Sequence, residues 1–134
     1  MKYLLDTNVC VAHLRGKNAL VLHRFGLHPP TDLVLCSVVV GELCYGARRS
    51  LNPAREQALV DAFVAQFVSL PFDDAAARVY ATIRHDLESR GLRIGENDLD
   101  IAAIALANNL VLVTHNTAEF SRVPGLTLED WEVP

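Results

Sequence analysis

The stretch Leu110-Val111-Leu112-Val113, followed by the polar residues Thr114-His115-Asn116, is the strongest strand signal in this chain of 134 residues. A strand that is apolar on both faces is typical of the centre of a parallel sheet covered by helices. The stretch therefore indicates an α/β protein in which the other strands are joined to it through helices.

Outward from this stretch, strand and helix signals alternate along the whole chain. Short apolar strands are predicted at 3–5, 33–36 and 68–70. Helices are predicted at 9–16, 19–25, 37–49, from Asn52-Pro53 onward, from Asp73 or Asp74 to Gly91, and at 99–109, with Ser37 as the N-cap of the third. Because parallel strands need crossover connections, we predict a three-layer fold: a central parallel sheet of four to five strands with helices on both faces. Residues 1–134 are expected to form a single domain.

Oxygen-bearing side chains follow several of these apolar runs. Asp6 follows the first strand, and Asn116, with Glu119 nearby, follows the last. Glu42 lies about one turn into the helix after the second strand, and Asp98 lies in the first turn of its helix. Ligands of doubly wound sheets gather at the carboxyl ends of the strands, so these side chains are expected to meet at one edge.

Each of these residues also has an ordinary structural explanation. Asp6 and Asn116 suit helix N-caps, and Asp98 suits a first helical turn, where the helix dipole favours an ionised acid. Glu42 fits least well, because glutamate is a poor N-cap and the apolar residues around it leave only a narrow solvated face. Acids gathered from distant points, with no Lys or Arg beside them in sequence, indicate a site for a hard metal ion.

Other signals for chemistry are weaker. The five histidines show no zinc spacing, and no Gly-rich phosphate loop is present. His115 lies beside the expected site and could contact substrate, although a lone loop histidine is often unremarkable. Arg49 is seven residues after Glu42 and returns to the same helix face, where it could hold a phosphate; the alternative is a basic residue favoured by the helix C-terminus. Asp100 is expected to point away from Asp98.

Composition restricts the classes of protein that remain. Hydrophobic residues make up 51% of the chain, which is enough for a core without disulfide or metal staples. The net charge of −4 gives no overall attraction for nucleic acid, so binding to RNA or DNA would need a local patch or bridging cations. Cys10, Cys36 and Cys44 have no paired spacing, which favours the reducing cytoplasm, and no apolar run is long enough for a membrane span.

Four segments together resemble a known family. They are Leu5-Asp6-Thr7-Asn8, the run from Ser37 to Ala47 around Glu42, the run from Ile94 to Ala103 around Asp98, and Val113-Thr114-His115-Asn116-Thr117-Ala118-Glu119-Phe120. In order and spacing they resemble the PIN-domain ribonucleases, and among these the VapC toxins of bacterial type II toxin–antitoxin pairs. The resemblance covers nearly the whole chain.

The resemblance implies a single PIN domain with a metal-dependent endoribonuclease activity that uses Mg²⁺, with Mn²⁺ as a substitute. It implies that Asp6, Glu42 and Asp98 hold the metal and take part in catalysis together with position 116. That position is often Asp in PIN domains and is Asn116 here, which suggests a weaker ligand, with Glu119 as a possible extra acid. Thr7, Asn8, Arg49 and His115 are candidate substrate contacts.

The same resemblance implies partners and a substrate. It implies a VapB-type antitoxin, a homodimer, and contact with operator DNA only through the antitoxin. It implies an RNA substrate, with the anticodon stem-loop of initiator tRNA favoured. The apolar residues of the first two helices, Val11, Leu14, Leu20, Leu22 and Phe25, exceed what one buried stripe requires, and we expect the antitoxin to cover part of them.

Two other classes of function are weighed against this one. A haloacid-dehalogenase-like phosphatase also begins with a strand and an Asp, but it needs an acid where this chain has Asn8, and a later Lys that is missing. The other alternative is a non-catalytic PIN-like binding partner or co-repressor, which an assay of metal-dependent RNA cleavage would distinguish.

Overall fold

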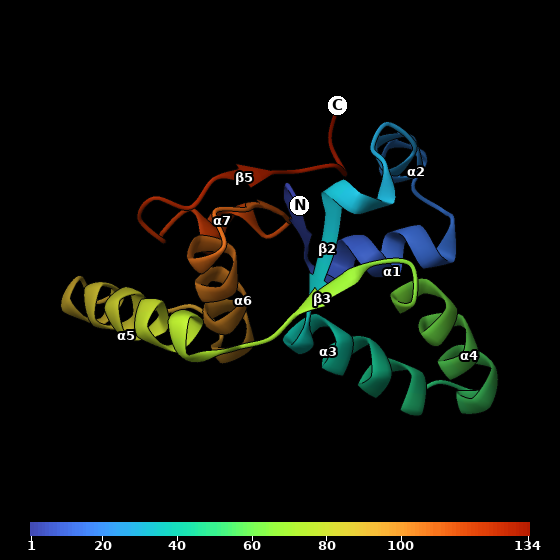
Figure 1. Cartoon of the computed structure of the whole chain (residues 1–134), viewed down its shortest axis with the longest axis horizontal. Coiled ribbons are helices and arrows are strands. Elements are labelled where there is room, and N and C mark those ends of the chain that lie inside the picture. Colours follow the sequence, from blue (N-terminus) through green and yellow to red (C-terminus); the bar gives the residue numbers. More distant parts are fainter.

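The computed structural model describes residues 1–134 and contains a five-stranded sheet, with the strands in the order β3-β2-β1-β4-β5 (Figure 1). The strands are β1 (Tyr3–Leu5), β2 (Leu33–Cys36), β3 (Val68–Leu70), β4 (Val111–Val113) and β5 (Leu128–Glu129). Every neighbouring pair is parallel. The α/β class and the parallel sheet of four to five strands are confirmed, although the edge strand β5 was not predicted.

Seven α-helices and one short 3-10 helix connect the strands. They are α1 (Thr7–Arg15), α2 (Ala19–Gly26), the 3-10 helix η1 (Pro30–Asp32), α3 (Ser37–Arg48), α4 (Pro53–Val64), α5 (Asp74–Ser89), α6 (Glu96–Ala107) and α7 (Thr117–Phe120). Two details of the sequence prediction were wrong. Ser37 is the first residue of α3 and not its cap, which is Cys36 without a capping side chain; α6 begins at Glu96, before the predicted start at 99.

The helices form two layers, one on each face of the sheet. Figure 1 shows α5, α6 and α7 on one side of the strands and α1 to α4 on the other. The strand order explains this division. Right-handed crossovers from β1 to β2 and from β2 to β3 place the connecting helices α1 to α4 on one face of the sheet. The connection from β3 to β4 runs in the opposite direction across the sheet, so α5 and α6 lie on the other face.

The core is one cluster that spans both faces of the sheet, and on one face the Ala-rich helix α6 packs against β4. Residues 101–105 of α6 are fully buried, as are Leu112 and Val113 of β4. Small side chains allow the helix to lie close to the sheet, and burial of each larger aliphatic side chain contributes about 1.5–3 kcal/mol. No helix combines the length and the apolar composition that crossing a membrane requires.

The strand order also creates a crevice at one end of the sheet. The chain moves outward from β1 through β2 to β3 and then returns to β4 on the other side of β1. The carboxyl ends of β1 and β4 therefore adjoin, and the Asp6 N–H donates to the Val113 carbonyl at 2.9 Å. Such a switch point is where open α/β sheets bind ligands.

Candidate active site

Asp6 is held at the switch point by hydrogen bonds to both carboxylate oxygens. It is the N-cap of α1, where Oδ1 accepts from the Thr7 N–H at 2.8 Å, and Oδ2 accepts from the Thr114 hydroxyl at 2.8 Å. Its exposed fraction is only 5%. Burial raises the pKa of Asp6, while the hydrogen bonds from Thr114 and Thr7 act in the opposite direction. The capping explanation for Asp6 is therefore correct but incomplete, because the same carboxylate also belongs to a partly buried cluster of acids.

Glu42 reaches the same cluster from α3. It is half-buried, and its Oε1 accepts a hydrogen bond from the Thr7 hydroxyl at 2.8 Å. Thr7 thus touches two acids at once, since its backbone N–H binds Asp6 and its side chain binds Glu42. The hydrogen bond to Thr7 thus holds an acid of α3 near the carboxyl end of β1.

Asp98 and Glu119 are joined by the amide of Asn116. The Asn116 Nδ2 donates to Asp98 Oδ2 at 3.3 Å and to Glu119 Oε2 at 2.6 Å. Asn116 occupies the N-cap position of α7, but its side chain caps nothing. The capping explanation proposed from sequence therefore fails for this side chain. The amide nitrogen of Asn116 is thus turned toward two carboxylates and holds them next to each other.

The acids influence one another electrostatically. Burial, the charge of Asp6, a hydrogen bond with Glu119 and the charges of Glu119 and Glu42 together raise the pKa of Asp98 to about 7. None of the ion pairs of the molecule involves these four acids. A set of carboxylate oxygens with mutual repulsion and no basic partner suits a hard divalent cation, which would relieve the repulsion. The donor set therefore fits the predicted metal.

A groove of about 800 Å³ extends from this cluster between α1, α3 and α4. Thr7, Asn8, Glu42 and Arg49 all line it. The Arg49 guanidinium lies 4.9 Å from the centroid of the Tyr45 ring. Three of the four candidate substrate contacts thus share one groove with a proposed metal ligand.

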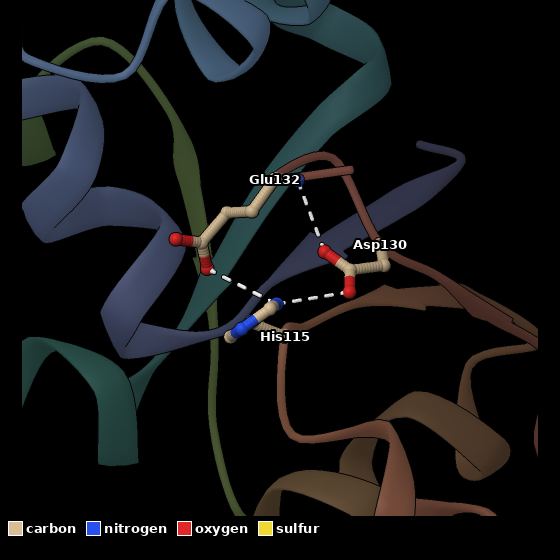
Figure 2. Close-up of side chains that lie close together, drawn as sticks. All are labelled: His115, Asp130 and Glu132. Atoms are coloured by element: carbon tan, nitrogen blue, oxygen red, sulfur yellow. Dashed lines mark hydrogen bonds and ion pairs between the residues drawn. The ribbon is translucent and has the colours of Figure 1, made fainter. Parts of the chain in front are cut away.

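His115 is directed elsewhere. Its Nδ1 lies 2.9 Å from Asp130 Oδ2 and 3.9 Å from Glu132 Oε2, both in the C-terminal tail (Figure 2). Hydrogen bonding to Asp130, together with the charges of Asp130 and Glu132, raises the pKa of His115. The structure therefore pairs this residue with two acids that the sequence did not suggest as site residues.

Thr114 is the site residue that the sequence analysis missed. It is fully buried, and besides donating to Asp6 its hydroxyl accepts the N–H of Asn116 at 3.0 Å. One side chain thereby links the ends of β1 and β4. The signal in the sequence was a polar residue directly after an apolar strand. The role of such a hydroxyl cannot be inferred until its hydrogen-bond partner on the neighbouring strand is known.

Comparisons with known proteins place the chain among relatives of one kind. The family model described as PIN domain matches residues 3–126. The chain is 40% identical over 131 residues to a tRNA(fMet)-specific endonuclease VapC from Shigella flexneri, covering 98% of each chain. It is 36% identical over 133 residues to Ribonuclease VapC2 from Rickettsia felis, covering 98% of this chain and 99% of that one.

Solved structures agree with this placement. A chain of the DNA-bound VapBC from Salmonella typhimurium superposes with a TM-score of 0.92 at 37% identity, covering 98% of both chains. A chain of VapBC2 from Rickettsia felis, bound to a DNA fragment from their promoter, gives a TM-score of 0.90 at 36% identity. It covers 98% of this chain and 99% of that chain.

Proposed function

This chain belongs to the PIN-domain family, among the VapC ribonucleases, and from that premise we propose that it hydrolyses RNA with Mg²⁺ at its acidic cluster. Asp6, Glu42 and Asp98 are the proposed metal ligands, and Mn²⁺ is expected to substitute for Mg²⁺. The observation that carries the proposal is the group of mutually repelling acids at the switch point, which no basic residue neutralises. We further propose that residues 1–134 act as a single PIN domain in the cytoplasm, as the toxin of a type II toxin–antitoxin pair.

The proposed roles follow from the contacts of each residue. Asp6 is oriented by Thr114 and Thr7, which leaves it little freedom to turn away from a bound cation. Asn116 keeps Asp98 and Glu119 adjacent, so Asn116 is a positioning residue and Glu119 an accessory acid. A bound divalent ion would supply Lewis-acid stabilisation of the scissile phosphate and an activated water.

RNA binding is proposed along the groove beside the cluster. Thr7 and Asn8 lie where the groove meets Glu42, and Arg49 lines it as well. A guanidinium suits a phosphate oxygen of the RNA backbone, and the metal would offset the repulsion between RNA and the acids. His115, engaged with Asp130, is expected to contribute less than Arg49. The Shigella flexneri relative is named for its action on tRNA(fMet), and we propose initiator tRNA, cut in its anticodon stem-loop, as the substrate here.

A VapB-type antitoxin is the proposed protein partner, since the similar solved structures are VapBC complexes. The groove offers Val11 and Leu14 of α1, both half-buried, as an apolar floor. Leu20 and Leu22 of α2 are each 39% exposed, but the prediction that Phe25 is available was wrong: it is 9% exposed and packs against Trp131. Operator DNA is expected to be reached only through the antitoxin, and a homodimer of the toxin remains a prediction.

An RNA cleavage assay with purified protein tests the proposal. Mg²⁺ or Mn²⁺ should support cleavage of initiator tRNA, and EDTA should abolish it. Asp98→Asn keeps the shape but removes a charge, so cleavage should fall by orders of magnitude, whereas Asn116→Ala should cost less. Asp100→Asn, on the same helix, is the matched control and should cut normally. Cleavage that persists in excess EDTA would refute the metal mechanism, and a protein that never cuts RNA would support the non-catalytic binding partner.

A further inference from the structure

A second group of potential metal ligands lies outside the acidic cluster. It consists of His115, in the loop after β4, and Asp130 and Glu132, in the tail after β5 (Figure 2). One donor atom from each of the three lies within 4.8 Å of the other two. Figure 2 shows the imidazole turned toward both carboxylates, with its Nδ1 facing them. We call these three residues the tail triad.

The tail triad is held in place by the surrounding structure. The parallel pairing of β4 with β5, in which the Thr114 N–H donates to the Glu129 carbonyl at 2.9 Å, brings the tail beside the loop. Trp131, between the two acids, is fully buried and stacks on His28. The Glu132 N–H donates to Asp130 Oδ1 at 3.0 Å, which orients that carboxylate. The strand pairing, the buried Trp131 and the backbone hydrogen bond thus fix the positions of these three side chains.

The charges and distances of the tail triad suit a dication. The side chains of Asp130 and Glu132 are 15% and 21% exposed, and their ion pairs are with His115 alone. Two carboxylates carry two negative charges, and one imidazole can carry at most one positive charge, so the group keeps a net negative charge. Tetrahedral ligands at about 2.0–2.1 Å from a zinc ion are separated from each other by about 3.3–3.4 Å. The observed separations of 2.9 and 3.9 Å from Nδ1 lie on either side of this value.

We propose that the tail triad is a binding site for a transition-metal dication of the Zn²⁺ class, separate from the acidic cluster. Imidazole nitrogen with two carboxylates selects Zn²⁺, Co²⁺ or Ni²⁺ over Mg²⁺, because Mg²⁺ prefers oxygen ligands and keeps its waters. His115 Nδ1, Asp130 and Glu132 supply three ligands and leave a fourth position for water. A bound ion would fasten the tail to the loop that carries Asn116, so it is expected to stabilise the folded chain.

The tail triad and the acidic cluster are made of different residues. The charges that shift the pKa of His115 come from Asp130 and Glu132, whereas those that shift the pKa of Asp98 come from Asp6, Glu119 and Glu42. Saturating Mg²⁺ competes for the acidic cluster, whose donors are oxygens, and competes less for the tail triad, which includes an imidazole nitrogen.

Calorimetric titration of the tag-free protein with Zn²⁺, in saturating Mg²⁺, tests this inference. The parent should bind one Zn²⁺ with micromolar affinity and show a raised melting temperature. His115→Ala and the isosteric Glu132→Gln should each weaken binding at least tenfold and abolish the thermal shift. His85→Ala, which removes an exposed histidine of α5, is the matched control and should bind as the parent does.

The acidic cluster provides the second control. Asp98→Asn should keep Zn²⁺ binding intact, whatever it does to RNA cleavage, so failure of this inference is distinguishable from failure of the proposed nuclease. Zn²⁺ binding that survives both His115→Ala and Glu132→Gln, or that is lost in Asp98→Asn, would overturn it. So would the absence of Zn²⁺ binding by the parent in Mg²⁺.

Discussion

At the residue scale, Asp98 is repelled by the neighbouring carboxylates, and a bound cation would relieve this repulsion. Its carboxyl has a pKa of about 7, raised first by burial and then by the charge of Asp6. At the proposed metal site, a proton and a metal ion would therefore compete for the same carboxylate near neutral pH. Metal binding should release protons, and the site should bind metal more tightly as the pH rises.

We predict that without metal the protein becomes less stable as the pH rises from about 4 to 7. In this window the folded state keeps a proton on Asp98 that the unfolded state has lost, so stability falls with rising pH. Asp6 also has a raised pKa and acts in the same direction, whereas the raised pKa of His115 lowers stability only above its ordinary value of 6.5. Denaturant unfolding in EDTA should show a smaller loss for Asp98→Asn than for the parent. Equal losses in the two proteins would contradict the assignment to Asp98.

Thr114 provides a second prediction at this scale. Thr114→Val keeps the volume but removes the donor to Asp6 and the acceptor for the Asn116 N–H, at a cost of roughly 1–3 kcal/mol in stability. Loss of the hydrogen bond from Thr114 should also raise the pKa of Asp6 further. The pH–rate profile should then shift to higher pH, and cleavage should need a higher Mg²⁺ concentration. Thr114→Ser, which keeps the hydroxyl, should restore both. If Thr114→Val leaves the metal requirement and the pH profile unchanged, Thr114 has no positioning role.

At the scale of elements, the short strand β5 and the tail after it are fixed by a single large side chain. Trp131 is fully buried, and its Nε1 donates to Glu129 at 3.0 Å. Its ring packs edge-on against Tyr3 and Phe25 and stacks on His28. Two residues of strand could not hold the tail alone, so the tryptophan anchors β5 to the core.

We therefore predict that Trp131→Ala lowers the free energy of unfolding by about 3–5 kcal/mol. The tail should also become more mobile. Relative to the parent, amide hydrogen exchange in the variant should speed up more in β5 than in β1. Val133→Ala, which changes a 44% exposed side chain two residues away, is the control and should change stability little. A small effect of Trp131→Ala would mean that the tail is not part of the cooperative core.

At the scale of the whole molecule, the groove beside the acidic cluster joins α1, α3 and α4 into one surface. Apolar side chains such as Leu14 and Leu43 lie along it, and Arg15 and Arg49 lie among them. An amphipathic antitoxin segment with acidic residues would match this pattern. The overall charge of −4 would not by itself attract such a segment, so the local pattern must provide the recognition.

Co-expression with the small open reading frame adjacent to the gene should yield a complex that stays together during purification at low salt. Leu14→Asp places a charge in the groove and should weaken the complex, whereas Leu51→Asp, at a fully exposed position outside it, should not. Unfolding curves for both variants show whether the folded state is intact. Two proteins that purify separately would refute the proposed partner.

The sequence by itself determined the class of fold and singled out three acids, Asp6, Glu42 and Asp98, that the structure brings close together. An apolar run such as 110–113 favours a strand covered on both faces, and helices between such runs favour a parallel sheet. Asp6, Glu42 and Asp98 stood out because a carboxylate beside an apolar run needs a reason to be there. These are local properties, and local sequence is sufficient to reveal them.

Only the tertiary structure decided which side chains meet. The return of the chain from β3 to β4 puts Thr114 against Asp6, 108 residues away, and turns the Asn116 amide toward Asp98 and Glu119. The strand β5 is too short to be recognised from the sequence, and its pairing with β4 brings His115 to Asp130. Hydrogen bonds act over about 3 Å, and proximity between distant parts of a chain depends on strand order, which no local pattern encodes.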